Sequence, residues 1–101
     1  MDATTQADII VAAIRCNGTE KQILKAIEEL AELQRALARD LSGEAVEDGI
    51  PENVYEEIAD VEIMLAQLRM IYDAGQIDDW KDSKLERLAR MLGLNIQEDA
   101  Q

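Results

Sequence analysis

The sequence predicts an all-α fold, and three observations support this prediction. Apolar residues recur at helical spacing, no stretch sustains the apolar–polar alternation of a strand, and the only proline, Pro51, stands where a helix can begin. With 101 residues, 48 % of them hydrophobic, the chain suits one compact domain over residues 1–101. We expect four helices in a bundle-like arrangement with short connections between antiparallel neighbours.

The first helix is expected from about Thr5 to Cys16. Thr5 and Asp8 stand in the capping-box relation, and Asn17-Gly18 is a typical helix end. Its inward face would carry Ile9, Ile10, Ala13 and Ile14. Cys16 is the only cysteine, so an intrachain disulfide is excluded, and we expect a small buried thiol.

The second helix is expected to start at Thr19, with Gln22 completing a capping box, and to end at Gly43. One apolar stripe follows this helix through Ile23, Ile27, Leu30, Leu37 and Leu41. Residues 42–53 are polar, contain two glycines and are expected to form a loop. The sequence leaves open whether this loop acts as a lid.

The third helix is expected to begin at Pro51 and to end at Gly75. It carries two apolar flanks and should therefore pack between two neighbours; the flanks are Val54, Ile58, Val61, Leu65, Leu68 and Tyr72, and Met64 and Ile71. A fourth helix is expected over 77–92, with Leu85, Leu88 and Leu92 inward and Gly93 after it. The tail, 94–101, is expected to be disordered.

The composition excludes several kinds of partner and site. A net charge of −12 disfavours nonspecific binding to nucleic acid or to anionic membranes, and an anionic ligand would need a divalent metal to bridge it to this protein. The chain has no histidine, which excludes histidine-based triads and mixed Glu/His di-iron sites. Carboxylates must then carry any chemistry, and they prefer Mg²⁺, Mn²⁺ or Ca²⁺.

Cellular location and assembly are predicted from size and hydropathy. No apolar run approaches the length of a membrane span, and the N-terminal stretch lacks a basic signal-peptide start, so we expect a cytoplasmic protein. A small domain covers more apolar surface by association, so a homo-oligomer is expected. The sequence does not choose between a dimer and a tetramer.

Two acidic clusters, "EELAEL" at 28–33 and "EEIAD" at 56–60, stand on consecutive helices. On helical projection, Glu29 and Glu32 border the apolar stripe of the second helix, and Glu57 and Asp60 lie between the apolar flanks of the third. Two such pairs on antiparallel helices could surround a hard divalent ion.

A solvated acidic face with partial salt bridges is the alternative interpretation. Lys25 can pair with Glu29, and Arg35 can pair with Glu32. Glu57 and Asp60 have no basic residue three or four positions away, which favours a bound cation over a solvated face.

These acidic residues resemble a family signature. E-E-x-x-E, here Glu28 to Glu32, followed by E-x-x-D, here Glu57 to Asp60, is similar to the motif of the MazG-like all-α nucleoside triphosphate pyrophosphatases. The segments "QILKAIEELAELQRAL" and "EEIADVEIMLAQLRMIY" are similar to the two central helices of that family. The resemblance covers about residues 19 to 92.

The resemblance implies an enzyme that depends on Mg²⁺, with Mn²⁺ as an alternative ion, and that cleaves nucleoside triphosphates between the α and β phosphates. It implies metal ligands at Glu29, Glu32, Glu57 and Asp60. Glu28 would orient the attacking water or support the ligands, and a carboxylate, Glu28 or Glu29, would serve as general base. Candidates for phosphate binding are Lys21, Lys25, Lys84 and Arg87. The number of metal ions and the preferred base and sugar stay open.

A second class of function fits the same residues. A non-catalytic, oligomeric helical module could use its acidic face to bind a basic partner and its apolar stripes to form an oligomer core. Such a module would be indifferent to divalent metal, whereas the enzyme would depend on it.

Overall fold

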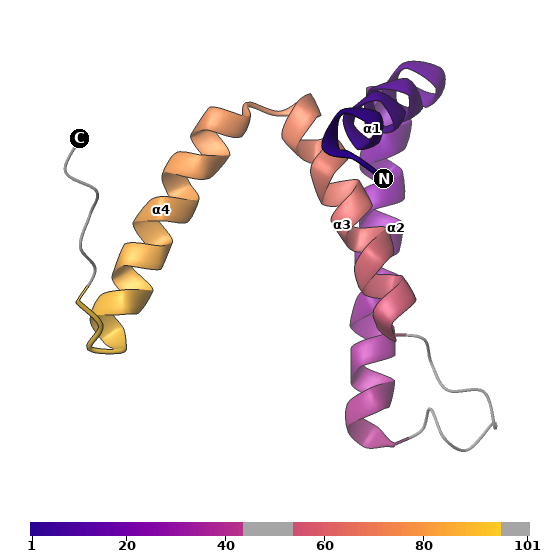
Figure 1. The fold of residues 1–101 in the computed structure, drawn as a ribbon. Helices are drawn as coiled ribbons and strands as arrows, with labels where there is room; N and C mark the ends of the chain where they lie inside the picture. The colour runs from indigo at the N-terminus through magenta and orange to yellow at the C-terminus, as the bar shows by residue number, and fades with distance from the viewer. Residues whose placement is uncertain (44–53, 96–101) are drawn as a thin grey trace. The chain divides into compact units, whose positions relative to one another are not determined.

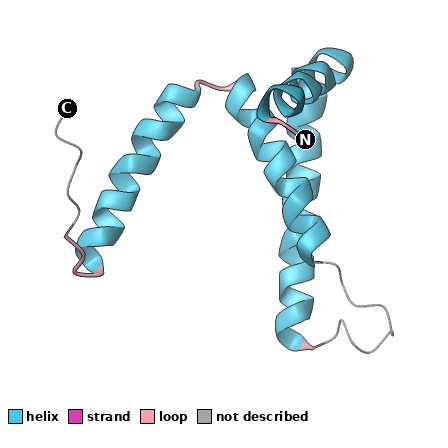
Figure 2. Cartoon of the chain, viewed as in Figure 1, coloured by secondary structure: helices cyan, strands magenta, loops and turns pink. Residues whose placement is uncertain are grey.

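The computed structural model describes residues 1–43 and 54–95, and all regular structure within these ranges is helical. Four helices follow one another: α1 (Ala3–Asn17), α2 (Thr19–Ser42), α3 (Val54–Ile71) and α4 (Ala74–Met91) (Figures 1 and 2). The all-α prediction is therefore confirmed. By its contacts the chain divides into two compact units, Met1–Ile71 with α1 to α3 and Tyr72–Gln101 with α4.

Helix α1 begins earlier than predicted because Asp2, and not Thr5, caps it. The Asp2 carboxylate accepts a hydrogen bond of 2.7 Å from the Thr5 backbone N–H, and this bond holds the pKa of Asp2 below its ordinary value. Ile10, Ala13 and Ile14 are half-buried, while Ile9 is exposed. Cys16 is exposed, so the expected buried thiol is wrong for this chain.

A single glycine joins α1 to α2. Gly18 has φ +85°, its N–H donates to Ile14 O, and its own carbonyl accepts from Gln22 N. Because Gly18 occupies the cap position, Thr19 is already the first helical residue, and the predicted Thr19–Gln22 capping box is wrong. The predicted end at Gly43 is confirmed, with this glycine in the left-handed conformation.

Helices α2 and α3 form an antiparallel pair, since Gln22 meets Gln67 at one end and Glu29 meets Glu57 and Asp60 nearer the other. Helix α1 contacts both of them, and α3 accordingly touches two neighbours, as predicted. Figure 1 shows α1 crossing one end of the α2–α3 pair. This hairpin places the acidic residues of the two helices opposite each other.

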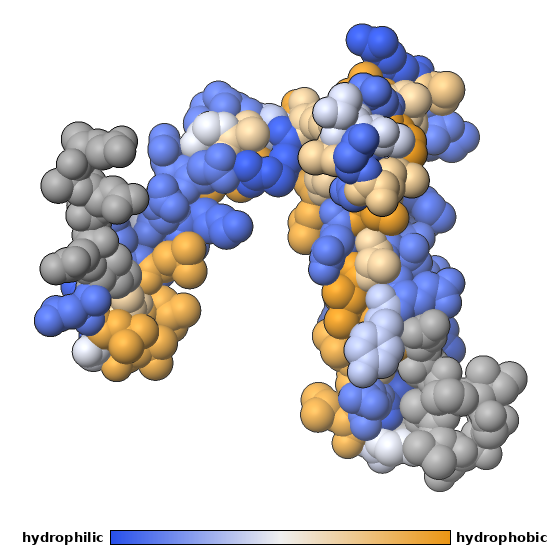
Figure 3. Space-filling model, viewed as in Figure 1, coloured by the Kyte–Doolittle hydropathy of each residue, from blue (hydrophilic) through white to orange (hydrophobic). Residues whose placement is uncertain are grey.

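The face of α2 that is buried differs from the predicted stripe. The buried residues are Gln22, Ala26, Glu29 and Ala36. Ile27, Leu30, Leu37 and Leu41 are exposed, and only Ile23 of the predicted stripe is half-buried. Figure 3 shows apolar surface along the α2–α3 pair. On α3 the buried residues are Val61, Met64 and Gln67.

Helix α4 belongs to the second unit and begins at Ala74, one residue before Gly75, which was predicted to end the third helix. The Asp73 carboxylate accepts hydrogen bonds from the backbone N–H groups of Gly75 and Gln76, so Gly75 lies in the first turn of α4 and does not end α3. At the other end, Gly93 N donates to Arg90 O and Leu94 N to Ala89 O, the Schellman pattern.

In the second unit, Leu85, Leu88 and Leu92 were predicted to face inward, but all three are exposed and form no core within that unit. Three predictions concern residues outside the described ranges: the start at Pro51, most of the 42–53 loop, and most of the 94–101 tail that was expected to be disordered. No described helix combines the length and apolar character that crossing a bilayer would require.

Candidate metal centre

Three carboxylates from α2 and α3 meet in the middle of the hairpin. Glu29, Glu57 and Asp60 each offer one oxygen, and these oxygens lie within 4.8 Å of one another. Glu57 and Asp60 are three positions apart and so project from the same side of α3, while the antiparallel pairing brings Glu29 to them from α2. The group comprises three of the four ligands that the sequence predicted.

Two oxygens in this group are buried without a hydrogen bond. Glu29 Oε2 and Glu57 Oε2 have no partner among the described residues, and Glu29 as a residue is only 8 % exposed. A buried carboxylate oxygen that lacks a partner costs free energy unless a proton or a cation approaches it. The donor set is made of hard oxygens, which fits Mg²⁺, Mn²⁺ or Ca²⁺.

Lys25 supplies the neighbouring positive charge. Its Nζ lies 3.2 Å from Glu29 Oε1 and 3.8 Å from an oxygen of Glu28. The hydrogen bond and charge of Glu29, with the charge of Glu28, raise the pKa of Lys25. One ammonium faces several carboxylates, so the site keeps a negative balance.

The electrostatics of Glu57 reflect this balance. Desolvation raises the pKa of Glu57 first, and the charges of Glu32, Asp60 and Glu29 raise it further. Glu32, the fourth predicted ligand, is exposed and lies outside the group of three, although its charge acts on Glu57. A cation at this site would relieve the repulsion that raises the Glu57 pKa.

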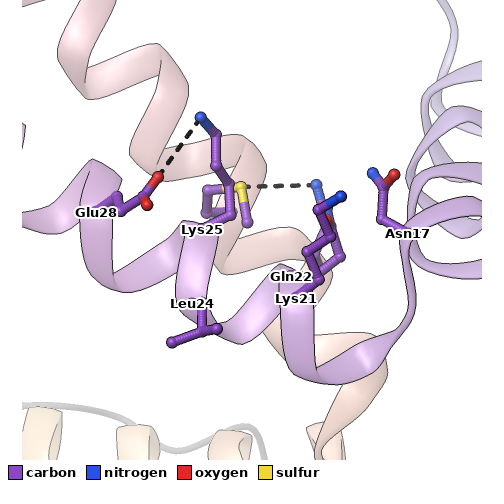
Figure 4. Close-up of a pocket in the computed structure, with 8 residues that line it drawn as sticks. Asn17, Lys21, Gln22, Leu24, Lys25 and Glu28 are labelled. Carbon is purple, nitrogen blue, oxygen red and sulfur yellow. Dashed lines mark hydrogen bonds and ion pairs between the residues drawn. The ribbon is translucent and has the colours of Figure 1, made fainter.

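A cavity of about 660 Å³ lies beside the centre on the same unit (Figure 4). Its walls include Lys21, Gln22, Lys25, Glu28, Met64 and Gln67. The two lysines that were predicted to bind phosphate thus line one cavity, and Glu28, the predicted support for the attacking water, lies there too. In Figure 4 the Lys25 ammonium turns toward the Glu28 carboxylate.

The remaining predicted phosphate ligands, Lys84 and Arg87, lie on α4 in the second unit. Lys84 Nζ stands 6.0 Å from the centroid of the Trp80 ring, near the outer limit of a cation–π contact. Their role in phosphate binding stays a prediction.

Sequence reasoning missed two residues of this region, Gln22 and Gln67. A signal was present, since Gln22 precedes Glu29 by seven positions and Gln67 follows Asp60 by seven, which is two helical turns in each case. Glutamine is ordinarily a surface residue, so its place on the buried face was not apparent.

Comparison of the chain with protein-family models, with curated proteins and with solved structures finds no match.

Proposed function

We propose that this protein is a Mg²⁺-dependent nucleoside triphosphate pyrophosphohydrolase of the cytoplasm that cleaves substrates to a monophosphate and pyrophosphate, in the service of nucleotide-pool housekeeping. The observation that carries the proposal is the pair of buried carboxylate oxygens, Glu29 Oε2 and Glu57 Oε2, which have no partner among the described residues. The motif that contains them is similar to that of MazG-like pyrophosphatases.

The carboxylates would hold the metal. Glu29, Glu57 and Asp60 are already gathered, and Glu32 is the further ligand that the motif implies. When bound, Mg²⁺ supplies charge neutralisation at phosphate oxygens and lowers the pKa of water. Mn²⁺ offers the same oxygen chemistry.

The other residues would position substrate and water. Lys21 and Lys25 line the cavity beside the carboxylates and would meet the phosphate charge, with Lys84 and Arg87 of α4 as further candidates. Glu28, which lines the cavity, or Glu29, which lies in the group of carboxylates, would accept the proton of the attacking water.

We further propose that the protein acts as a homo-oligomer. Ile27, Leu30 and Leu37 form a row on α2 that the other helices of the first unit leave exposed, with Ile27 as much as 59 % exposed. Adjacent apolar side chains of this kind are commonly covered by association. The same row also favours the competing function, an oligomeric interaction module without catalysis.

Product analysis on a panel of ribo- and deoxynucleoside triphosphates separates these functions. We expect monophosphate plus pyrophosphate with Mg²⁺ and neither product without it. Glu29→Gln and Glu32→Gln should abolish turnover, whereas Glu62→Gln, an exposed position on α3, should preserve it. Absence of turnover on every triphosphate, or release of orthophosphate alone, would refute the pyrophosphohydrolase and favour the interaction module.

A further inference from the structure

Gln22 and Gln67 form a buried polar pair across the α2–α3 interface. They are 5 % and 4 % exposed, and Gln22 Nε2 donates a hydrogen bond of 2.5 Å to Gln67 Oε1. Gln67 Nε2 reaches only Met64 Sδ, at 3.7 Å, and a thioether is a weak acceptor. These are the only hydrogen bonds that the described residues give to the two carboxamides, so part of their capacity stays unused.

Both carboxamides line the cavity beside the metal centre. Met64 provides an apolar wall there, and Lys21 and Lys25 bring positive charge to the same space (Figure 4). A volume of about 660 Å³ is in the range of pockets that hold small organic ligands. Glu28 also lines the cavity and pairs with Lys25, so the wall combines buried amides, a thioether and two lysines with one carboxylate, a lining that suits a ligand with a flat polar ring and an anionic group.

The distance to the carboxylates fits such a ligand. Gln22 and Glu29 are seven positions apart on α2, as Asp60 and Gln67 are on α3, which gives a rise of about 10 Å along either helix. Lys25 links the cavity to the carboxylates, since it lines the cavity and pairs with Glu29. A molecule whose phosphates lie at the carboxylates would therefore extend its other end into the cavity.

We propose that this cavity is the base-binding subsite of the protein, in which the carboxamides of Gln22 and Gln67 hydrogen-bond to the polar edge of a nucleobase and the Met64 thioether packs against its ring. This inference rests on the proposed function, because it assigns a place to the base of the nucleotide whose phosphates would be bridged to the carboxylates by a divalent metal. A carboxamide presents a donor beside an acceptor, which matches the edges of the common bases.

Binding is tested without turnover, by NMR of the ¹⁵N-labelled full-length chain. Uridine, cytidine, adenosine and guanosine are added separately, and ribose serves as the probe without a base. We expect at least one nucleoside to shift the side-chain amide signals of Gln22 and Gln67, with Gln34 and Gln76 unmoved and ribose without effect. If no nucleoside shifts either signal, or if ribose shifts them equally, the subsite is refuted.

Specificity is tested with the double variant Gln22→Met/Gln67→Met. It keeps the side-chain length and removes both polar partners together, so no buried amide is left unpaired. With pyrophosphate release as the assay, we expect the ratio of kcat/KM between the best and worst base to fall about tenfold or more. The matched control is Gln34→Met, at an exposed position of α2. An unchanged ratio in a double variant of native helicity would overturn the subsite.

The two experiments separate the two proposals. Nucleoside-induced shifts without turnover on any triphosphate would refute the pyrophosphohydrolase and leave the subsite standing. Turnover without such shifts would support the pyrophosphohydrolase and refute the subsite. If the double variant does not fold, the shifts in the unmodified chain decide the question.

Discussion

Lys25 Nζ lies 3.2 Å from Glu29 Oε1, while Glu29 Oε2 has no hydrogen-bond partner among the described residues. One oxygen of this carboxylate thus faces an ammonium group and the other is free to face a cation. The ammonium neutralises part of the negative charge that would attract a metal ion. Lys25 should therefore weaken the binding of a metal alone and strengthen the binding of a polyphosphate.

The variant Lys25→Met tests this double role. We expect its affinity for Mg²⁺ alone to rise and its affinity for a nonhydrolysable triphosphate analogue to fall, each by about tenfold, because the variant removes a positive charge that repels the metal ion and attracts the phosphates. Isothermal titration calorimetry measures both. Lys21→Met is the matched control, since Lys21 lines the same cavity but makes no ion pair with the described residues. Equal Mg²⁺ affinity in both variants would contradict this role.

Metal binding should stabilise the fold. At a Mg²⁺ concentration about 100 times its dissociation constant, linkage adds about 2.7 kcal/mol to the free energy of unfolding. For a domain of this size the midpoint should rise by about 10 °C or more, as measured by circular dichroism. Glu29→Gln and Asp60→Asn should lose most of this rise, and Glu62→Gln should keep it. A rise of equal size in all three variants would show that the ion binds elsewhere.

Glu57 should make the stability of the metal-free protein depend on pH. Its folded pKa lies above the ordinary value of 4.5, so the folded state holds the proton more tightly than the unfolded chain does. This contribution is fully present below pH 4.5 and is lost as the pH rises through the folded pKa.

We therefore expect the difference in urea midpoint between the parent and Glu57→Gln to change in favour of the variant as the pH rises. Comparison with the variant removes the opposite contribution of Asp2, whose lowered pKa makes its stabilisation disappear as the pH falls. If the difference in urea midpoint stays constant as the pH rises from 4.5 through the folded pKa of Glu57, then folding does not shift the pKa of Glu57.

The helices were predictable from the sequence, but the face that each one buries was less so. Periodicity located an apolar stripe on α2 through Ile27 and Leu30, yet the chain buries Gln22, Ala26 and Glu29 against its neighbours. The pattern shows which side of a helix is apolar, but it does not show which other element covers that side. The face that packs within one chain is therefore decided by tertiary contacts.

The predicted helix boundaries were wrong where two sequence signals for a helix end lay close together. Thr19 has the chemistry of a cap, but Gly18 already closes α1 and opens α2, so no room remains for a separate cap. Gly75 is a typical helix end, but Asp73 binds the N–H groups that follow it and starts α4 first. In contrast, the E-x-x-D spacing correctly anticipated that Glu57 and Asp60 share a side of α3 near Glu29, because spacing along one helix fixes geometry.

The exposed row on α2 should control association. We expect the parent chain to sediment as a dimer or tetramer and the double variant Ile27→Lys/Leu30→Lys as a smaller species, because each buried apolar side chain contributes about 1.5–3 kcal/mol. Analytical ultracentrifugation measures this. Glu20→Lys, which places the same charge in the first turn of α2, is the control. A monomeric parent chain would show that the row is not an interface between copies.

The cap of α4 offers a stability test confined to the second unit. Asp73→Ala removes the acceptor for Gly75 N and Gln76 N and should cost about 1 kcal/mol of helix stability. Hydrogen exchange should show faster exchange in the first turns of α4. Asp73→Ser is the control that keeps a side-chain acceptor, and equal exchange in both variants would show that the cap contributes little.

Ala26 has a consequence for the choice of ion. It is 2 % exposed and lies on the buried face of α2 between Gln22 and Glu29, where a small side chain occupies little space between the helices. Calcium requires longer bonds and more ligands than magnesium does. At a metal centre held by Glu29, Glu57 and Asp60, a bulkier residue at position 26 would be expected to move α2 and α3 apart and so to favour the larger ion over the smaller one.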